Sequence, residues 1–202
     1  MLIRMPSEMN SNQEYIELKV PIFESHTAIA VLMKNVQNLE IIKENLIKGN
    51  FDYDYGFINA KNIVSLEQIY SAYYKVMQDS AYNTMKSRTL HTEFIYALSP
   101  FKNIMDCLNK FGISKTSDVL LILKIVKKED ATTEYFESQL KHIKTVVTGE
   151  IIKLDDENLQ NFADAKSIAK NYKLKTNNRK SLDNDWNLVT RNVVSIIQLK
   201  GL

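Results

Sequence analysis

Apolar residues follow two different periods along this 202-residue chain. Alternation, which is typical of half-buried strands, runs from Ile16 to Ile22 and crosses Pro21 near its end. The largely apolar segment 119–126 predicts a central strand with both faces covered by other elements. Further strands are predicted at 27–33, around Tyr55 and Phe57, at 91–98, which is rich in β-branched and aromatic residues, and on a sheet edge at 150–154.

Apolar residues spaced by three and four positions predict the helices. Asn35 or Asn38 is the candidate cap of a first helix, which Gly49 ends because glycine readily adopts the left-handed conformation. Ser65 and Gln68 form a capping box at the start of a second helix. Further helices are predicted at 104–111, 135–147 and 186–197. A short helix capped by Asp155 is predicted to run to residue 162, and a further helical turn or two to residue 172.

Strands and helices alternate irregularly, without the βαβ rhythm of a doubly wound fold. The sequence therefore predicts the α+β class, with a single domain over 15–202 whose mostly antiparallel central sheet is packed by helices. The polar segment 1–14 is predicted to be a disordered N-terminal extension, and it lacks the continuous apolar core of a secretory signal. Residues 173–180 are predicted to form a loop.

Composition narrows the classes of function. Hydrophobic residues make up 45% and charged residues 25%, which is typical of globular domains. With only 5 Gly and 3 Pro, the sequence contains no Gly-rich phosphate-binding loop. The net charge of +2 neither requires nor excludes a nucleic-acid partner. The single Cys107 cannot form an internal disulfide and favours a reducing compartment. Apolar runs such as 119–123 are far shorter than a membrane helix of ~20 residues, so no membrane partner is expected.

No catalytic, cofactor or metal motif is recognisable in the sequence. His26, His91 and His142 stand far apart, outside any metal-ligand spacing, and each is predicted to be a surface or satisfied core histidine. Cys107 lies on the apolar side of its predicted helix, which favours packing over nucleophilic chemistry. The acidic run 155–157 has the ligands for a hard cation, but capping a helix start is the commoner use of such residues. We therefore expect no catalytic residue, no metal and no cofactor.

Basic side chains gather in two places. Six of them lie without an acid between 166 and 180, and Lys86 and Arg88 lie beside Tyr82 and Thr89. Basic groups interleaved with aromatic rings and hydroxyls suit phosphates and an unstacked base, although ordinary solvated surfaces have the same composition.

The C-terminal apolar residues are too numerous for one intramolecular helix face. One face is expected to pack on the domain, which leaves the other for a partner. These residues are Val193, Val194, Ile196, Ile197, Leu199 and Leu202.

A central segment resembles a known family. It reads TMKSRTLHTEFIYALSP at 84–100, continues with Asn103 and Ile104, and closes with KFGIS at 110–114. These residues resemble the small PRPK-binding (TPRKB-like) subunit of the KEOPS/EKC complex, fungal type. That family carries an MK-x-R-T-L-x-(S/T)-E strand, an LSP exit, an N-I helix start and a KFGI close, in this order and spacing. The flanking segments 23–42, 169–174 and 196–202 are also similar to the family.

The resemblance implies a non-catalytic regulatory subunit with a single α/β domain. Members of the family bind the atypical kinase/ATPase subunit of KEOPS and support its activity. The whole complex makes threonylcarbamoyladenosine in ANN-decoding tRNAs, with the chemistry in a different, metal-dependent subunit. Archaeal relatives grip the single-stranded CCA end of tRNA, and in fungi the complex is linked to telomeres and transcription. The implied location is the nucleus and cytoplasm, including telomeric chromatin.

Two surfaces follow from these patterns and from the resemblance. The kinase-subunit-binding residues are predicted to be Val193, Ile196, Ile197, Leu199 and Leu202. The tRNA-binding residues are predicted to be Lys75, Lys86, Arg88, Thr89 and Asn103, the last at a helix start that is open to a phosphate or a base edge. For Thr89 the alternative is a strand hydroxyl satisfied within the sheet. Two other hypotheses remain: a kinase-binding scaffold that touches no RNA, and a small enzyme with an unrecognised pocket.

Overall fold

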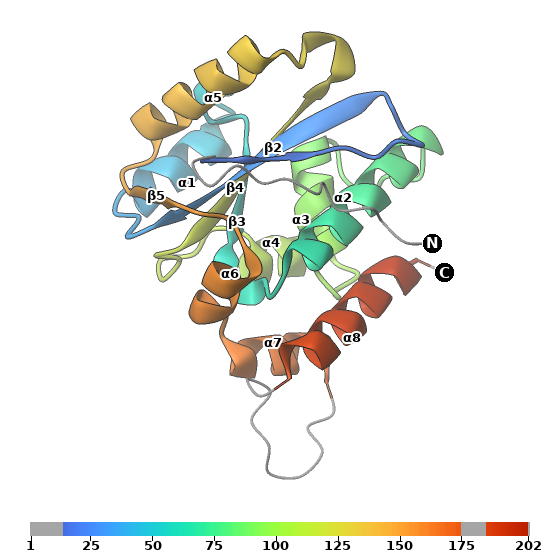
Figure 1. Cartoon of the computed structure of the whole chain (residues 1–202). Helices are drawn as coiled ribbons and strands as arrows, with labels where there is room; N and C mark the ends of the chain where they lie inside the picture. Colours follow the sequence, from blue (N-terminus) through green and yellow to red (C-terminus); the bar gives the residue numbers. More distant parts are fainter. Residues whose placement is uncertain (1–13, 175–184, 202) are drawn as a thin grey trace.

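The computed structural model describes residues 14–174 and 185–201 (Figure 1). Its strands are β1 (Ile16–Leu18), β2 (His26–Lys34), β3 (Gly56–Asn59), β4 (Leu120–Lys127) and β5 (Glu150–Ile152). Its α-helices are α1 (Leu39–Lys48), α2 (Leu66–Ala81), α3 (Leu90–Leu98), α4 (Ile104–Phe111), α5 (Thr133–Val146), α6 (Asp156–Phe162), α7 (Ala165–Tyr172) and α8 (Trp186–Leu199). Three short 3-10 helices connect them: η1 (Phe51–Tyr53), η2 (Ala60–Asn62) and η3 (Lys128–Asp130).

The strands form one antiparallel sheet with the order β1-β2-β4-β3. β2 pairs with β4 over residues 26–33, and Ala30 lies opposite Leu123 in this register. On its other side β2 pairs first with β1 and then with β5, so these two short strands share one edge. This topology confirms the predicted α+β class with an antiparallel central sheet.

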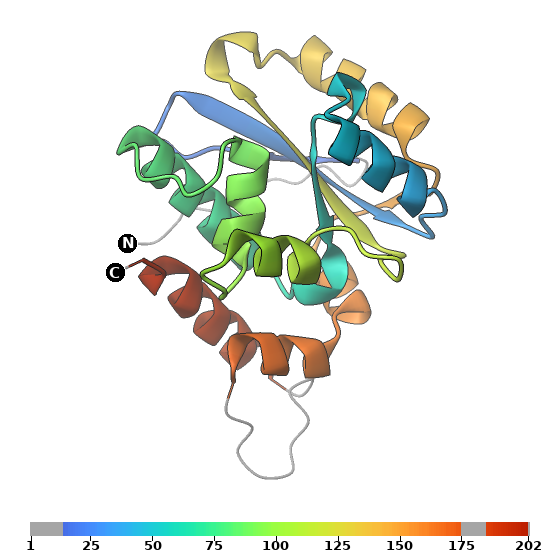
Figure 2. The same cartoon turned by 180° about the vertical axis from the view of Figure 1, so that it is seen from behind.

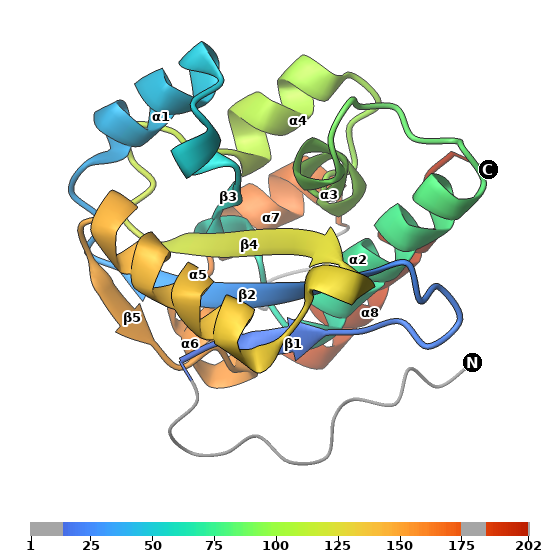
Figure 3. The ribbon, with the colours of Figure 1, turned by 90° about the horizontal axis from the view of Figure 1, so that it is seen from above.

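Helices cover both faces of the sheet (Figures 1 and 3). Successive residues of β2 point to opposite faces. Ala30 and Leu32 therefore join the larger core, to which α2, α3, α6, α7 and α8 contribute, whereas Val31 and Met33 join the smaller core beneath α1 and α5 (Figure 2). β4 is buried on both faces, as its largely apolar sequence predicts.

The segment 91–98 is a helix, so the predicted strand is wrong. Its buried residues His91, Phe94, Ile95 and Leu98 are spaced at i, i+3, i+4 and i+7, which is a helical stripe. Thr89 caps the helix, because its side chain accepts a hydrogen bond from the backbone N–H of Thr92 at 3.1 Å. The β-branched and aromatic content favoured a strand, but the cap and the helical spacing decide the local structure.

The first strand is shorter than the alternation predicts. β1 ends at Leu18, Pro21 lies in a turn, and Ile22 is exposed. Proline lacks the N–H that a sheet ladder uses, so the chain leaves the sheet before it.

The first predicted helix cap also differs. Asn38 precedes α1 without a side-chain cap hydrogen bond, and its amide joins α1 to the end of α5 by donating to the carbonyl of Val146 at 2.9 Å. Asn35 has a positive φ of 55° and donates to Glu150 at 3.1 Å. Both asparagines therefore serve tertiary contacts.

Other predicted helix ends are confirmed. Ser65 accepts from the N–H of Gln68 at 3.2 Å, Asp155 caps α6, and Gly49 ends α1 with a φ of 68°. Gly112 follows α4 for a different reason, because a Cβ there would lie 2.5 Å from a backbone carbonyl oxygen.

Two predicted segments fall largely outside the described residues. Residues 1–13 of the predicted extension and 175–180 of the predicted loop lie outside, so both assignments stay predictions. Glu14 is described, and its carboxylate pairs with Lys144 at 2.8 Å. Within the part of the chain that is described, no helix is both long and apolar enough to cross a membrane.

Candidate interaction surfaces

The inner face of α8 completes the larger core. Val189, Val193 and Ile197 are buried there. Near the end of the helix, the side-chain amide of Gln198 donates to the carbonyl oxygen of Ser71 on α2 at 2.9 Å and to its hydroxyl at 2.6 Å. This face is therefore committed to the fold.

The outer face of α8 is available for contact with a partner protein. Leu199 is 63% exposed and Leu188, three turns earlier, is 54% exposed, so both lie on one outward stripe about 16 Å long. Of the other predicted partner residues, Ile196 packs partly against the core and Leu202 lies outside the described residues. Only Leu199 among the described candidates thus presents a largely free apolar side chain.

Two carboxylates hold the loop formed by residues 84–89, here called the 84–89 loop. Glu93 on α3 is fully buried and accepts hydrogen bonds from the backbone N–H of Lys86 at 3.0 Å and of Ser87 at 2.7 Å. Asp79 on α2 accepts one from the hydroxyl of Thr84 at 3.0 Å. A buried carboxylate that binds consecutive backbone N–H groups fixes the backbone between them.

The loop leaves two basic side chains available. Lys86 and Arg88 are exposed, and among the described residues neither forms an ion pair. Lys75 differs, because its ammonium pairs with Asp79 at 3.2 Å and its side chain is only 15% exposed. The exposed ring of Tyr82 lies just before the loop in the chain, at the end of α2.

Thr89 and Asn103 are both helix caps. Thr89 precedes α3, and the Asn103 side-chain oxygen accepts from the N–H of Met105 at 2.8 Å at the start of α4. Because α3 has nine residues, about 13 Å, these two caps lie near opposite ends of it. The structure therefore brings together Lys86, Arg88 and Thr89 and separates Asn103 from them. Thr89 serves a helix and not the sheet.

Sequence reasoning missed Lys200. Its ammonium donates to the carbonyl oxygens of Tyr96 and Ser99, the latter at 2.8 Å, and lies 3.3 Å from the centroid of the Tyr96 ring. These carbonyls belong to the last turn and end of α3, where the helix dipole attracts cations. Burial lowers the pKa of Lys200 to about 8. No local signal finds this contact, because the partners are about a hundred positions away in the chain.

Lys200 links the C-terminal segment to α3, the helix that also holds the 84–89 loop. Lys75, Asp79 and Glu93 are close enough for their charges to act on its ammonium. We call these four residues the junction cluster, and it lies where α2, α3 and the end of α8 meet. Two positive and two negative groups balance there, so the partly buried charges compensate one another.

Asp54 joins β4 to α3 on another side of the sheet. Its carboxylate accepts hydrogen bonds from His91 Nδ1 at 3.1 Å and from Lys124 Nζ at 3.0 Å. The backbone N–H of Ile125 donates to His91 Nε2 at 3.0 Å, so Nδ1 of the neutral ring carries the hydrogen. The hydrogen bond from His91, then the hydrogen bond and charge of Lys124, hold the pKa of Asp54 well below its usual range.

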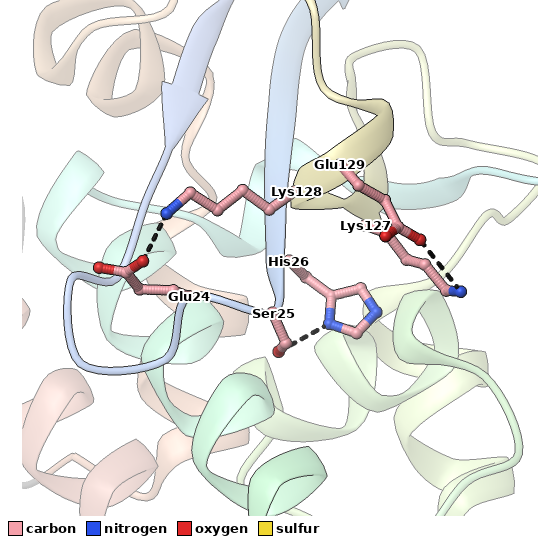
Figure 4. A pocket seen from close by; sticks show the side chains of 6 residues that line it. All are labelled: Glu24, Ser25, His26, Lys127, Lys128 and Glu129. Carbon is pink, nitrogen blue, oxygen red and sulfur yellow. Dashed lines mark hydrogen bonds and ion pairs between the residues drawn. The ribbon is translucent and has the colours of Figure 1, made fainter.

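A solvent-open hollow of about 510 Å³ bears on the enzyme hypothesis (Figure 4). In it the hydroxyl of Ser25 lies 2.9 Å from His26 Nδ1, which is the spacing of a nucleophile and its base. The two nearby carboxylates do not orient the imidazole, because Glu24 pairs with Lys128 at 2.5 Å and Glu129 with Lys127 at 3.4 Å. Burial and the charge of Lys127 also lower the pKa of His26. The arrangement therefore lacks the third member of a triad.

Comparison with known proteins settles the family. The sequence model of the family described as "Kinase binding protein CGI-121" matches residues 33–201, which include the 84–89 loop and α8. This chain belongs to the CGI-121 family. The match confirms the resemblance drawn from the central segment, and the family description agrees with the predicted binding of a kinase.

Fungal members of the CGI-121 family cover most of the chain. A protein of Debaryomyces hansenii named "EKC/KEOPS complex subunit CGI121" is 32% identical over 93% of this chain and 98% of its own length. Proteins of the same name from Aspergillus terreus and Schizosaccharomyces pombe are each 34% identical. They cover 82% and 77% of this chain, and 82% and 86% of their own lengths, respectively.

Proposed function

We propose that this protein is a non-catalytic subunit of an EKC/KEOPS complex, in which it binds and activates the complex's atypical kinase/ATPase subunit. The family description and the names of the fungal relatives support complex membership and kinase binding. The observation that carries the site is the outer stripe of α8, where Leu199 and Leu188 are exposed while the inner face is committed to the core. Burying one such leucine contributes ~1.5–3 kcal/mol to an interface.

The same proposal includes a tRNA contact at the 84–89 loop. Its support is the pair Lys86 and Arg88, which have no carboxylate partner among the described residues and follow the exposed Tyr82 by four and six positions in the chain. Cationic groups next to an aromatic face suit a single-stranded nucleic acid, such as a tRNA CCA end presented for threonylcarbamoyladenosine formation. The proposal also includes a nuclear and cytoplasmic location and roles at telomeres and in transcription. These parts are supported only by the family resemblance.

Gel-shift affinity for tRNA with and without its CCA end, at two salt concentrations, tests this contact. Two phosphate contacts predict a slope of about −1.4 on a log–log plot for a single strand. The double variant Lys86→Ala with Arg88→Ala is expected to lower affinity for intact tRNA and to keep kinase binding. A matched double variant, Lys43→Ala with Lys141→Ala, removes two exposed lysines from the helices on the other face of the sheet and is expected to bind tRNA like the wild type.

The scaffold without RNA contact remains the second candidate. The observation in its favour is that Lys75, one of the predicted RNA-binding residues, is already paired with Asp79. If removal of CCA leaves the affinity of the wild type unchanged, or if the Lys86/Arg88 variant binds tRNA like the wild type, the scaffold function is preferred.

A further inference from the structure

The two proposed surfaces are connected through a single short helix. Lys200 directly follows the exposed Leu199 and holds the C-terminal end of α3 through the carbonyls of Tyr96 and Ser99. Glu93, three residues before Tyr96, holds the 84–89 loop through two backbone N–H groups. α3 is therefore fixed by the C-terminal segment at one end, and it fixes the loop at the other.

The contacts at the junction cluster are more buried than ordinary surface contacts. The Lys200 ammonium makes two hydrogen bonds to carbonyl oxygens and a cation–π contact at 3.3 Å, while Glu93 is fully buried. Partly buried charges of this kind are sensitive to small displacements, because a misplaced charge loses its compensation in a medium of low dielectric constant.

We propose that binding of the kinase subunit at α8 and binding of RNA at the 84–89 loop are energetically coupled, with Lys200 as the residue that transmits the coupling to α3. This inference rests on the proposed function. A partner that covers Leu199 restrains the residue next to it and so keeps Lys200 on the end of α3. Glu93 then holds the loop backbone in the conformation that presents Lys86 and Arg88. The loop orders at a lower entropic cost when RNA arrives, so each ligand raises the affinity for the other by the same factor.

The test is a thermodynamic cycle on the full chain. Calorimetry measures the affinity for the kinase subunit with and without a saturating synthetic single-stranded RNA that ends in CCA. In the wild type we expect the RNA to tighten kinase binding at least threefold. Lys200→Met removes the hydrogen-bond donors and the charge and is expected to reduce this factor to near one. Lys200→Arg keeps both and is expected to retain most of it.

A matched variant and an independent readout separate coupling from a general loss of structure. Lys141→Met removes an exposed lysine from α5, on the other face of the sheet, and is expected to leave the factor unchanged. Hydrogen exchange at the backbone N–H of Lys86 and Ser87 is expected to slow when the kinase subunit binds, in the wild type but not in Lys200→Met.

The outcomes distinguish the inference from the function on which it rests. If both ligands bind the wild type but neither changes the affinity for the other, the coupling is wrong and the proposed function stands. If the factor survives in Lys200→Met, Lys200 does not transmit it. If the RNA fails to bind at all, the RNA part of the proposed function fails, and the coupling fails with it.

Discussion

Asp54 accepts hydrogen bonds from a histidine of α3 and a lysine of β4, and this makes the carboxylate a source of stability that depends on pH. Its pKa in the folded chain is lowered, by the His91 hydrogen bond first and by Lys124 next. A group with a lowered pKa contributes its full stability above its unfolded pKa, near 3.8, and loses it as the pH falls through the folded value.

Replacement of this carboxylate is therefore expected to lower the free energy of unfolding most at neutral pH and less in acid. Asp54→Asn should lower the free energy of unfolding by up to about 1 kcal/mol at pH 7, a limit set by the partial exposure of the side chain, and the difference should shrink by pH 3. Urea unfolding at the two pH values measures it. Asp52→Asn changes an exposed neighbour and serves as the control. Equal differences at both pH values would show that the charge of Asp54 is not the cause.

Lys200 gives a pH dependence in the alkaline range. Burial, helped by the like charge of Lys75, lowers its pKa from 10.5 to about 8, against the raising effect of Cys107, Glu93 and Asp79. Between pH 8 and pH 10.5 the unfolded chain keeps the proton of Lys200, whereas the folded chain has released it. The free energy of unfolding contributed by this group therefore rises with pH across this window, and the gain is lost as the pH falls back through 8.

The comparison with Lys200→Met isolates this effect from the titration of the tyrosines. From pH 7 to pH 9.5, the wild type is expected to gain stability relative to the variant by about 1 kcal/mol, after discounting for the exposed part of the side chain. Chemical denaturation of both proteins at the two pH values is the measurement. A constant difference would mean that the ammonium keeps its ordinary pKa in the fold.

Among elements, α8 offers a clear contrast between two neighbouring hydrophobic residues. Leu199→Glu changes a side chain that is 63% exposed, so the fold should survive while binding to the kinase subunit weakens at least tenfold, or ~1.4 kcal/mol. Ile197→Glu instead places a carboxylate in the core and is expected to destabilise the fold by at least about 3 kcal/mol. Calorimetry measures binding, and circular dichroism on heating measures stability.

The control for this pair adds the same charge elsewhere. Asn161→Glu lies at an exposed position of α6 and is expected to change neither quantity. Wild-type affinity in a folded Leu199→Glu variant would place the kinase contact on another surface.

Elements could be predicted from the sequence where one signal dominates. The capping box at Ser65 and the glycine at 49 locate the ends of α2 and α1, because caps act through neighbouring residues. The segment 91–98 carries conflicting signals, because its β-branched and aromatic content favours a strand while its spacing and the Thr89 cap favour a helix. The strand at 16–22 was overextended because Pro21 ends it before the apolar alternation does.

The candidate surfaces could be predicted only in part, for a physical reason. Lys86 and Arg88 are recognisable because they lie in a polar stretch beside aromatic residues. The burial of Val193 and Ile197, the pairing of Lys75 and the role of Lys200 depend on which helices meet, and that is a property of tertiary packing. Spacing along one helix cannot tell a face that meets α2 from one that meets a partner.

At the scale of the whole molecule, the protein is expected to act on a catalytic partner without catalysing a reaction itself. The sequence has no phosphate-binding glycine loop, and in the hollow near His26 both carboxylates are paired with lysines. We expect the purified chain to show no ATP hydrolysis and to raise hydrolysis by the kinase subunit when the two are mixed.

A colorimetric phosphate assay measures both quantities. Leu199→Glu is the matched control, because a variant that no longer binds should no longer raise the hydrolysis rate. Hydrolysis by the chain alone that persists through several columns and disappears in His26→Ala would instead favour the enzyme hypothesis.

The two short strands that share one edge of β2 bear on how the protein behaves at high concentration. Unpaired backbone groups along a long edge strand are a template for strands of other chains, and so for aggregation. β1 and β5 have only three residues each, and β3, on the opposite edge, has four. Beyond Gly56, the first residue of β3, His91 accepts the hydrogen bond of the Ile125 N–H that an added strand would need. Edges this short protect the chain from polymerising through its sheet.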